Sequence, residues 1–269
     1  MMPVHNQLLL IGCGNLGAIL LKFWLQHKTF QQIIVIQPSL SAQKSFEHFP
    51  NLSFVQNHAS IPSNFKPDVI TLAAKPHHLL EILPHYAQYQ TSCLFISLAA
   101  SISIQHLQSK SGPKASIIRL MPNIAIQVGQ SLNLAYAPPS LSQTYKELTR
   151  DLFAHTGQFI WLDHEDLIDI LTPICGSGPA YFFLLTQILA ENISKHGLSQ
   201  ETSLAMANQV LLGSALLTRE NPNLEQLRSF VTSKGGVTEA ALNILQPQLP
   251  NLIEKALNAA LNRLNELKP

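Results

Sequence analysis

The sequence predicts an α/β fold, in which a parallel sheet covered by helices is followed by an all-helical domain. Three observations predict this fold. Short runs rich in β-branched residues alternate with helical patterns as far as Leu162, an order typical of a parallel sheet with helices on both faces. Beyond Asp163, apolar residues recur at helical spacing with no β-rich segment between them. A glycine-rich turn, Gly12 to Gly17, joins the first strand to the first helix.

The N-terminal elements follow from the alternating runs. The main strands are expected at Leu8–Gly12, Ile33–Gln37, Leu52–Val55, Val69–Ala73, Leu94–Leu98 and Ser116–Met121. Helices between them are expected at Leu16–His27, Leu79–Tyr89 and Ile104–Gln108. Further strands at Leu132–Tyr136 and Gln158–Leu162 are expected to flank a helix over Leu141–Phe153. Together these elements predict one domain over residues 1–162.

The C-terminal part, residues 163–269, is expected to be helical throughout. Helices are predicted at Pro179–His196, Gln200–Arg219, Glu239–Leu245 and Leu249–Leu267, where apolar residues recur three and four positions apart. The first two of these helices are too apolar to be buried within one small domain. We therefore expect this domain to pair with a second copy of the chain as a homodimer, with a larger assembly of dimers left open.

Bulk composition excludes several classes of function. The 269 residues leave room for two domains, and a hydrophobic share of 46% supplies a core for both. The formal net charge of +1 comes without a basic run, which argues against a nucleic-acid partner. The apolar stretch Ala180–Leu185 is far shorter than the roughly 20 residues that span a membrane. The N-terminus has no secretion-signal pattern, so a cytoplasmic protein is expected.

Neither the histidines nor the cysteines predict a metal site or a disulfide framework. No two of the 11 histidines are three or four positions apart, the spacing that places two ligands on one helix face. Cys13, Cys93 and Cys175 are scattered and form no CxxC pair. We therefore expect no metal and no disulfide.

The turn after the first strand reads Gly12-Cys13-Gly14-Asn15-Leu16-Gly17, a GxGxxG pattern that opens a helix. Gly12 permits the tight turn, Gly14 lets the backbone approach a pyrophosphate, and Gly17 lets the helix pack closely on the strand. The free N–H groups at the helix N-terminus would then bind the phosphates. The pattern predicts a dinucleotide site of the Rossmann type, and a glycine-rich turn without a ligand is the alternative.

The end of the second strand favours NADPH over NADH. Enzymes that use NAD usually carry an acidic residue about 20 positions beyond the glycine turn, where it binds the ribose 2′-hydroxyl. Gln37 takes that place, and the segment that follows, which includes Ser39, contains no acid to repel a 2′-phosphate. Lys44 would attract the phosphate, or is a solvated helix lysine. NADPH is the expected cofactor, with NADH left open.

A second glycine-containing loop lies far downstream, with the sequence Ser233-Lys234-Gly235-Gly236-Val237-Thr238. Two glycines flanked by hydroxyl residues at a helix start can form a small anion site from backbone N–H groups. A carboxylate would fit such a site. A helix cap at Ser233 or Thr238 explains the same residues without a ligand.

Five short motifs follow one another in a fixed order along the chain. They are Ala73-Ala74-Lys75-Pro76, Ser97-Leu98-Ala99-Ala100, Arg119-Leu120-Met121-Pro122-Asn123, Gly176-Ser177-Gly178-Pro179-Ala180-Tyr181 and the Ser233–Thr238 loop. Together with the N-terminal GxGNxG pattern, they resemble the motifs of the pyrroline-5-carboxylate reductase family. The resemblance spans nearly the whole chain and implies a Rossmann domain followed by a helical dimerisation domain.

The resemblance also implies a reaction, in which 1-pyrroline-5-carboxylate is reduced to L-proline by hydride transfer to the imine carbon, as the last step of proline biosynthesis. It implies that the cofactor is held by Gly12, Gly14, Asn15, Leu16, Ser39, Asn57, Ala74, Lys75, Pro76, Ala99 and Ala100. The candidates for binding the substrate are Ser177, Ser233, Gly235, Gly236 and Thr238. Thr238 is the expected catalytic hydroxyl, hydrogen-bonded to the ring nitrogen.

An imine is a good hydride acceptor, so the reaction requires mainly the positioning of donor and acceptor carbons. The sequence shows no catalytic histidine constellation, which fits an imine and argues against carbonyl reduction. Another two-domain NAD(P)-dependent imine or hydroxy-acid reductase, or a non-catalytic nucleotide-binding paralogue, are the alternatives. The chain departs from the family pattern near the expected site, where the usual residues are replaced by Ser101, Ile124, Ser229 and Lys234.

Overall fold

The computed structural model describes residues 5–269, except for the side chains of residues 40–42, so the first four residues of the predicted N-terminal domain lie outside it. The chain forms two compact units. The first runs to Ser177 and also includes Leu261–Pro269, and the second is Gly178–Ala260. The last turns of α9 (Val237–Glu266) therefore belong to the first unit, which is the unit that contains the sheet.

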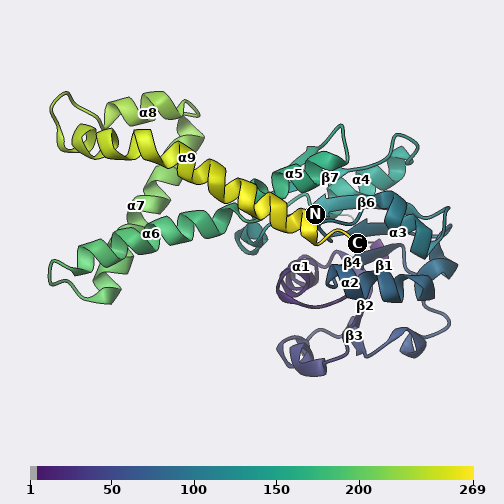
Figure 1. Ribbon diagram of the computed structural model, residues 1–269. Coiled ribbons are helices and arrows are strands. Elements are labelled where there is room, and N and C mark those ends of the chain that lie inside the picture. The colour runs from purple at the N-terminus through teal and green to yellow at the C-terminus, as the bar shows by residue number, and fades with distance from the viewer. Residues whose placement is uncertain (1–4) are drawn as a thin grey trace. The chain divides into compact units, whose positions relative to one another are not determined.

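The first unit is built on an eight-stranded sheet in the order β3-β2-β1-β4-β5-β6-β7-β8 (Figure 1). The strands are β1 (His5–Ile11), β2 (Phe30–Ile36), β3 (Leu52–Val55), β4 (Val69–Leu72), β5 (Leu94–Ser97), β6 (Ser116–Met121), β7 (Ser131–Tyr136) and β8 (Gly157–Trp161). All neighbouring strands are parallel except β6 and β7. The strand order reverses between β1 and β4, and ligands of such sheets bind at the carboxyl ends of the strands at this switch point.

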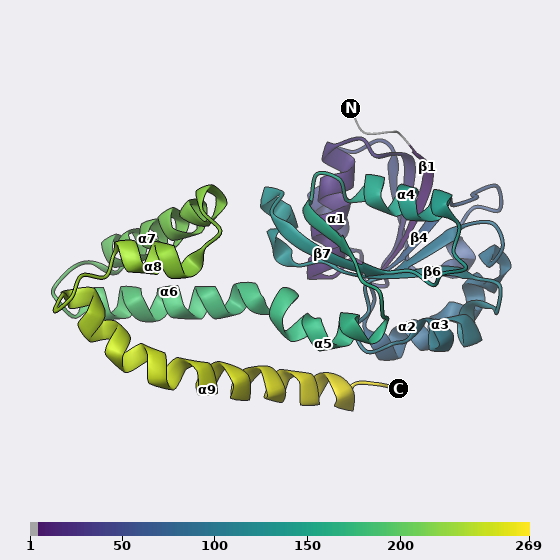
Figure 2. The same cartoon turned by 90° about the horizontal axis from the view of Figure 1, so that it is seen from above.

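Helices cover both faces of the sheet, as predicted. Figure 2 shows α1 (Asn15–Gln26) and α4 (Gln143–Leu152) over one face, and α2 (Pro76–Ile82) and α3 (Ile104–Ser111) over the other. Trp24 in α1 is fully buried, and its indole N–H donates a hydrogen bond of 3.1 Å to the carbonyl oxygen of Leu152 in α4. Because both faces are covered, the central strands β4 and β5 are buried at every residue, whereas the edge strand β8 alternates in burial.

The second unit consists of α6 (Gly178–Ser194), α7 (Gln200–Glu220), α8 (Leu224–Phe230) and most of α9. The antiparallel neighbours α6 and α7 are joined by a short turn, in which the Ser199 hydroxyl caps α7 by accepting a hydrogen bond from the Thr202 N–H. Few side chains of this unit are buried. Large apolar residues of α6, including Phe182 and Phe183, are more than half exposed at 59% and 56%. The unit therefore presents more apolar surface than a small helical bundle usually leaves uncovered.

The predicted fold class is confirmed, and individual elements differ in detail. β7 runs antiparallel to β6, because only the short 3-10 helix Ile124–Val128 and a left-handed Gly129 connect them, and a parallel return needs a longer crossover. The helix expected at Leu79–Tyr89 is α2 followed by the 3-10 helix Leu83–Tyr89. The helices α5 (Asp166–Cys175) and α8 lie in the part expected to be helical but were not assigned as separate helices, and α9 is continuous through Pro247, where a break between two helices was expected.

The expectation about apolar length also needs correction. By length and composition alone, the helical stretch Asp166–Ser194 could cross a membrane, with 29 residues and a mean hydropathy of 1.4 in its best window. The predicted apolar stretch, Ala180–Leu185, covers only part of α6, and α5 precedes it. A turn at Gly176 and Ser177 separates α5 from α6 within this stretch.

Candidate functional site

The glycine turn between β1 and α1 is packed against the turn that follows β4. Gly12 has a φ of 91°, and a Cβ atom at this position would lie 2.7 Å from the backbone nitrogen of Ala74. A Cβ atom at Gly17 would lie 2.6 Å from the carbonyl oxygen of Gly12. A Cβ atom at Gly14 would meet nothing within 4 Å. The outer two glycines are therefore required by the protein's own backbone, whereas the space beside Gly14 is open to a ligand.

The same turn is fastened by Gln37, the residue at the end of β2 that replaces the usual acid. Its side-chain oxygen accepts a hydrogen bond of 2.8 Å from the backbone N–H of Cys13. The first helical residue, Asn15, follows without a side-chain cap hydrogen bond, so the leading N–H groups of α1 lack partners within the helix. Burial raises the pKa of the Cys13 thiol to about 11, so this cysteine is protonated at neutral pH. The turn thus offers backbone donors and no negative charge.

The residues expected near a 2′-phosphate lie after neighbouring strands. Ser39 follows β2 and is exposed, and Lys44 is exposed in the 3-10 helix Leu40–Phe46. Asn57 follows β3, and its side-chain oxygen accepts a hydrogen bond of 3.3 Å from the Ser60 hydroxyl. Because β2 and β3 are parallel and paired up to their last residues, the segments that follow them leave the same edge of the sheet.

The residues expected beside the nicotinamide also lie in turns at this edge of the sheet. Ala74 and Lys75 follow β4, and Pro76 begins α2 with Lys75 as the capping residue. Ala99 and Ala100 follow β5, where the Ala99 N–H donates a hydrogen bond of 3.3 Å to the Ser97 hydroxyl. β4 pairs with β1 on one side and with β5 on the other. The structure therefore brings the three turns after β1, β4 and β5 together along one edge.

The downstream loop precedes α9 in the second unit and closes on itself. Gly235 has a φ of 73°, which a glycine adopts without strain. The Gly236 N–H donates a hydrogen bond of 2.9 Å to the Ser233 carbonyl oxygen. The Gly235 N–H donates one of 2.7 Å to the carboxylate of Glu239, in the first turn of α9. Both glycine N–H groups thus have hydrogen-bond partners in or next to the loop. The partner of the Gly235 N–H is a carboxylate. Thr238 is partly buried beside the two glycines.

Glu239 was not among the residues predicted for the site. A glutamate in the third helical position that reaches back to the start of its helix is a known capping arrangement, so its spacing was the available signal. The other substrate candidate, Ser177, is exposed at the end of the first unit and donates its N–H to the Thr172 carbonyl oxygen. Among residues 5–269, no group of three or more His, Cys, Asp or Glu side chains is placed to hold a metal ion.

Two known families match the chain. Residues 165–267 match the family described as pyrroline-5-carboxylate reductase dimerisation, and residues 7–101 match NADP oxidoreductase coenzyme F420-dependent. The pyrroline-5-carboxylate reductase of Haemophilus influenzae is 35% identical over 98% of both chains.

Solved structures are similar over the same length. The pyrroline-5-carboxylate reductase of Coxiella burnetii is 31% identical with a TM-score of 0.85, over 97% of this chain and 98% of that one. A pyrroline carboxylate reductase of Plasmodium falciparum with NADP bound has a TM-score of 0.85 over 98% of both chains. At 24% identity, this second structure shows the shared fold alone.

The glycine turn yields a prediction that separates binding from folding. We expect Gly14→Ala to keep the melting temperature and to weaken NADPH binding about tenfold or more, because the new methyl group enters the open space. Gly17→Ala should instead lower the melting temperature, because its methyl group meets the Gly12 carbonyl oxygen. Thermal unfolding and titration of NADPH fluorescence measure the two effects. Unchanged NADPH binding in Gly14→Ala would contradict the assignment of the turn.

Proposed function

The chain belongs to the pyrroline-5-carboxylate reductase family, and from this premise we propose how its residues perform the family's reaction. The protein is an NADP-dependent oxidoreductase that reduces 1-pyrroline-5-carboxylate to L-proline. A hydroxy-acid reductase and a non-catalytic paralogue are not favoured, because the relatives that match nearly the whole chain are pyrroline-5-carboxylate reductases. The structural observation that carries the proposal is the glycine turn, closed on the protein side and open at Gly14, at the switch point of the sheet.

The residues around the glycine turn fit a dinucleotide. When bound, NADPH supplies the hydride. The backbone of Gly12, Gly14, Asn15 and Leu16 would hold its pyrophosphate. The N–H groups of Gly14, Asn15 and Leu16 lie at the N-terminus of α1, which has no side-chain cap, and would bind the phosphates. The Gly12 N–H donates a hydrogen bond of 2.9 Å to the Ile36 carbonyl oxygen, so Gly12 would contribute through the shape of the turn. Gln37 binds the turn through Cys13 and brings no carboxylate to the ribose, while Ser39, Lys44 and Asn57 leave the same edge. This set favours a 2′-phosphate, so NADPH is the preferred donor of the two nicotinamide cofactors.

The loop from Ser233 to Thr238 is proposed to bind the substrate carboxylate. The Glu239 carboxylate already accepts a hydrogen bond from the Gly235 N–H, which supports the view that this backbone suits a carboxylate. Substrate binding through Gly235 then requires Glu239 to move away. Thr238 would donate or accept a hydrogen bond at the ring nitrogen and so orient the imine. Ser177 is a further candidate for the substrate site.

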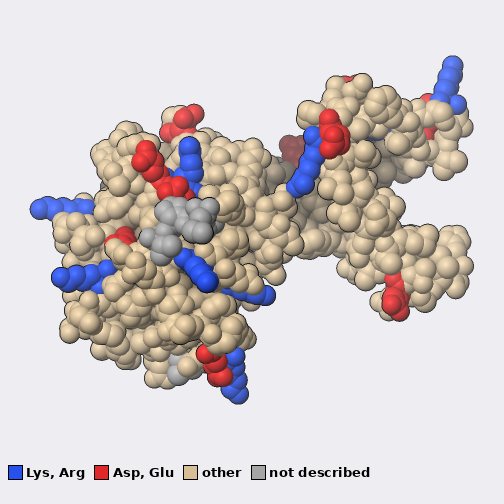
Figure 3. All heavy atoms as spheres, turned by 180° about the vertical axis from the view of Figure 1, so that it is seen from behind, with Lys and Arg blue, Asp and Glu red and all other residues tan. Residues whose placement is uncertain are grey.

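The exposed helices support a homodimer, which is the assembly that the matched dimerisation family describes. Over α6–α9, the face drawn in Figure 3 carries only scattered charged side chains, with wide uncharged areas between them. A second copy of the chain would cover such a surface without burying unpaired charges. The residues expected to form this domain, 163–269, nearly coincide with the matched segment. A larger assembly of dimers and a cytoplasmic location remain predictions.

The proposed reaction is tested by mixing the purified protein with pyrroline-5-carboxylate and NADPH or NADH, and following the loss of nicotinamide absorbance. We expect turnover with both and a higher kcat/KM with NADPH. Thr238→Ala should lower kcat/KM about 10- to 100-fold, because a hydrogen bond to the reacting ring is lost, while Thr238→Ser keeps the hydroxyl and most of the activity. If Thr238→Ala were as active as the unmodified protein, Thr238 would have no role in the reaction.

The contact of Glu239 with the loop gives a second prediction. Glu239→Ala should lower the KM for pyrroline-5-carboxylate about threefold, because the protein's own carboxylate no longer competes for the Gly235 N–H. Glu254→Ala removes an equal charge from the exposed middle of the same helix and serves as the control. A KM that rises in Glu239→Ala at an unchanged melting temperature would mean that Glu239 helps to hold the substrate.

The homodimer is tested by a charge on the apolar surface of α6. Leu184 is 57% exposed within one chain, and Leu184→Lys is expected to shift sedimentation from dimer towards monomer, since a lysine would be buried without a partner. Lys195→Gln, at the end of the same helix, changes the charge at a position that is exposed and already polar. A Leu184→Lys protein that sediments as an unaltered dimer would place the interface elsewhere.

A further inference from the structure

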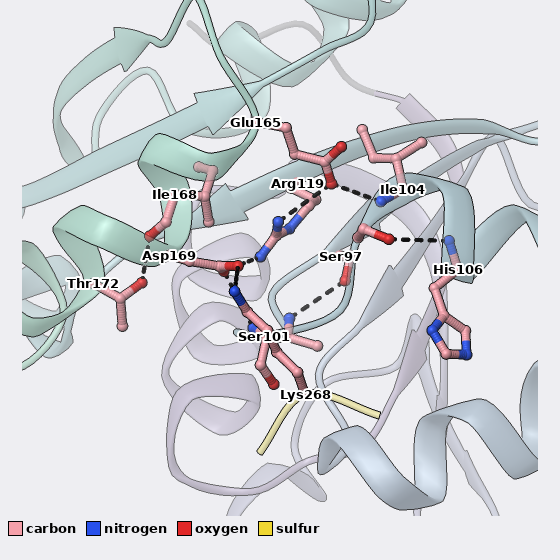
Figure 4. A network of polar contacts seen from close by, with 12 residues as sticks. Ser97, Ser101, Ile104, His106, Arg119, Glu165, Ile168, Asp169, Thr172 and Lys268 are labelled. Carbon is pink, nitrogen blue, oxygen red and sulfur yellow. Dashed lines mark hydrogen bonds and ion pairs between the residues drawn. The ribbon is translucent and has the colours of Figure 1, made fainter. Parts of the chain in front are cut away.

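A cluster of charged groups lies beside the turn that follows β5 (Figure 4). Arg119 of β6 is 1% exposed, and its guanidinium group donates hydrogen bonds to Glu165 at 3.2 Å and to Asp169 at 2.5 Å. The second carboxylate oxygen of Asp169 is paired with the ammonium group of Lys268 at 3.5 Å. Asp169 therefore lies between a buried arginine and the second-last residue of the chain.

The same cluster holds Ser101 in an unusual conformation. Ser101 has a φ of 71°, in the left-handed region that residues with a Cβ atom adopt only at a cost. It is 4% exposed. Its backbone N–H donates a hydrogen bond of 3.3 Å to Asp169, and its hydroxyl donates one of 3.2 Å to the carbonyl oxygen of Leu267. The conformation is thus supported on one side by α5 and on the other by the C-terminal residues.

Ser101 directly follows Ala99 and Ala100, the residues assigned to the nicotinamide half of the cofactor. Before them, the Ser97 hydroxyl accepts a hydrogen bond from the Ala99 N–H. After them, Ser101 is hydrogen-bonded to Asp169 and Leu267. The N–H of Ile104, the first residue of α3, donates a hydrogen bond of 2.6 Å to Glu165. The turn between β5 and α3 is therefore held by hydrogen bonds at both ends, and those at its second end depend on the carboxylates of Glu165 and Asp169.

We propose that Asp169, Leu267 and Lys268 are positioning residues, which hold Ser101 in its left-handed conformation and thereby fix Ala99 and Ala100 for cofactor binding. The assignment of this turn to the cofactor rests on the proposed function. The C-terminal residues thus contribute to the binding of NADPH, although they are far from the glycine turn in the sequence. A glycine at position 101 would adopt the same φ without this support.

The test combines removal of the C-terminus with a change at Ser101. A chain that ends at Glu266 lacks both Leu267 and Lys268. In the otherwise unmodified protein, this truncation should raise the Kd and the KM for NADPH about fivefold, with an unchanged KM for pyrroline-5-carboxylate. In the Ser101→Gly background, the same truncation should change the Kd for NADPH less than about twofold. Arg263→Ala, which removes an exposed ion pair at the same helix end, should change neither value.

Further variants keep the test decisive if the truncated chain does not fold. Lys268→Met retains the full length and removes the charge that faces Asp169, so its effect on NADPH binding should also shrink in the Ser101→Gly background. The proposal would be overturned if the truncation weakened NADPH binding equally in the unmodified and Ser101→Gly proteins and lowered the melting temperature of both. The cluster would then have a structural role only. Unchanged NADPH binding in both truncated chains would also overturn the proposal.

A measurement of NADPH binding tests the role of the C-terminal residues separately from the reduction of pyrroline-5-carboxylate. NADPH fluorescence reports binding without any imino acid, so the predicted dependence on Ser101 can be seen even in a protein that does not reduce pyrroline-5-carboxylate. In that case the proposed function fails and the role of the C-terminus stands. Normal turnover without the dependence on Ser101 would overturn the role of the C-terminus alone. No binding of NADPH by the unmodified chain would overturn both.

Discussion

The close contact between the backbone of Gly12 and that of Ala73 and Ala74 is the constraint on which the proposed NADPH site depends. This site lies at the edge of the sheet where β1, β4 and β5 end. A side chain at Gly12 would overlap both neighbours, so the turn after β1 can approach the turn after β4 only because this residue is glycine. Gln37 then fastens the turn from the β2 side through the N–H of Cys13. These contacts leave the helix N-terminus and the space beside Gly14 uncommitted, which is what a pyrophosphate requires.

Electrostatic contacts organise the neighbouring turn after β5. A buried guanidinium group is costly unless it is paired and hydrogen-bonded, and the two terminal nitrogens of Arg119 are paired with Glu165 and Asp169, whereas its Nε atom has no hydrogen-bond partner in the described part of the chain. The same carboxylates accept hydrogen bonds from the backbone of Ser101 and Ile104. One charged cluster therefore pairs a buried cation and also holds the turn after β5. A replacement of either carboxylate would affect both at once, and double-mutant cycles are needed to separate the two contributions.

The sequence predicted those features that arise from local patterns. Continuous apolar runs identified the strands, and GxGxxG identified the turn whose glycines the structure requires. The strand β7 was predicted, but its antiparallel direction was not, because a run of apolar residues carries no information on direction. α5 was not assigned as a separate helix, and α9 was predicted as two helices, with Pro247 in the gap between them, where proline usually ends a helix. The hydrogen-bond partners of Ser101 and Gly235 could not be predicted from the sequence. The contacts with Asp169, Leu267 and Glu239 depend on which groups the folded chain brings together.

Hydrogen exchange measured by mass spectrometry, with and without NADPH, tests most directly whether the dinucleotide lies along this edge of the sheet. The account predicts slower exchange on NADPH binding in the segments Gly12–Ala18, Ala74–Leu79 and Ala99–Ile104, which follow β1, β4 and β5. Protection confined to other segments, with these three unchanged at saturating NADPH, would contradict it.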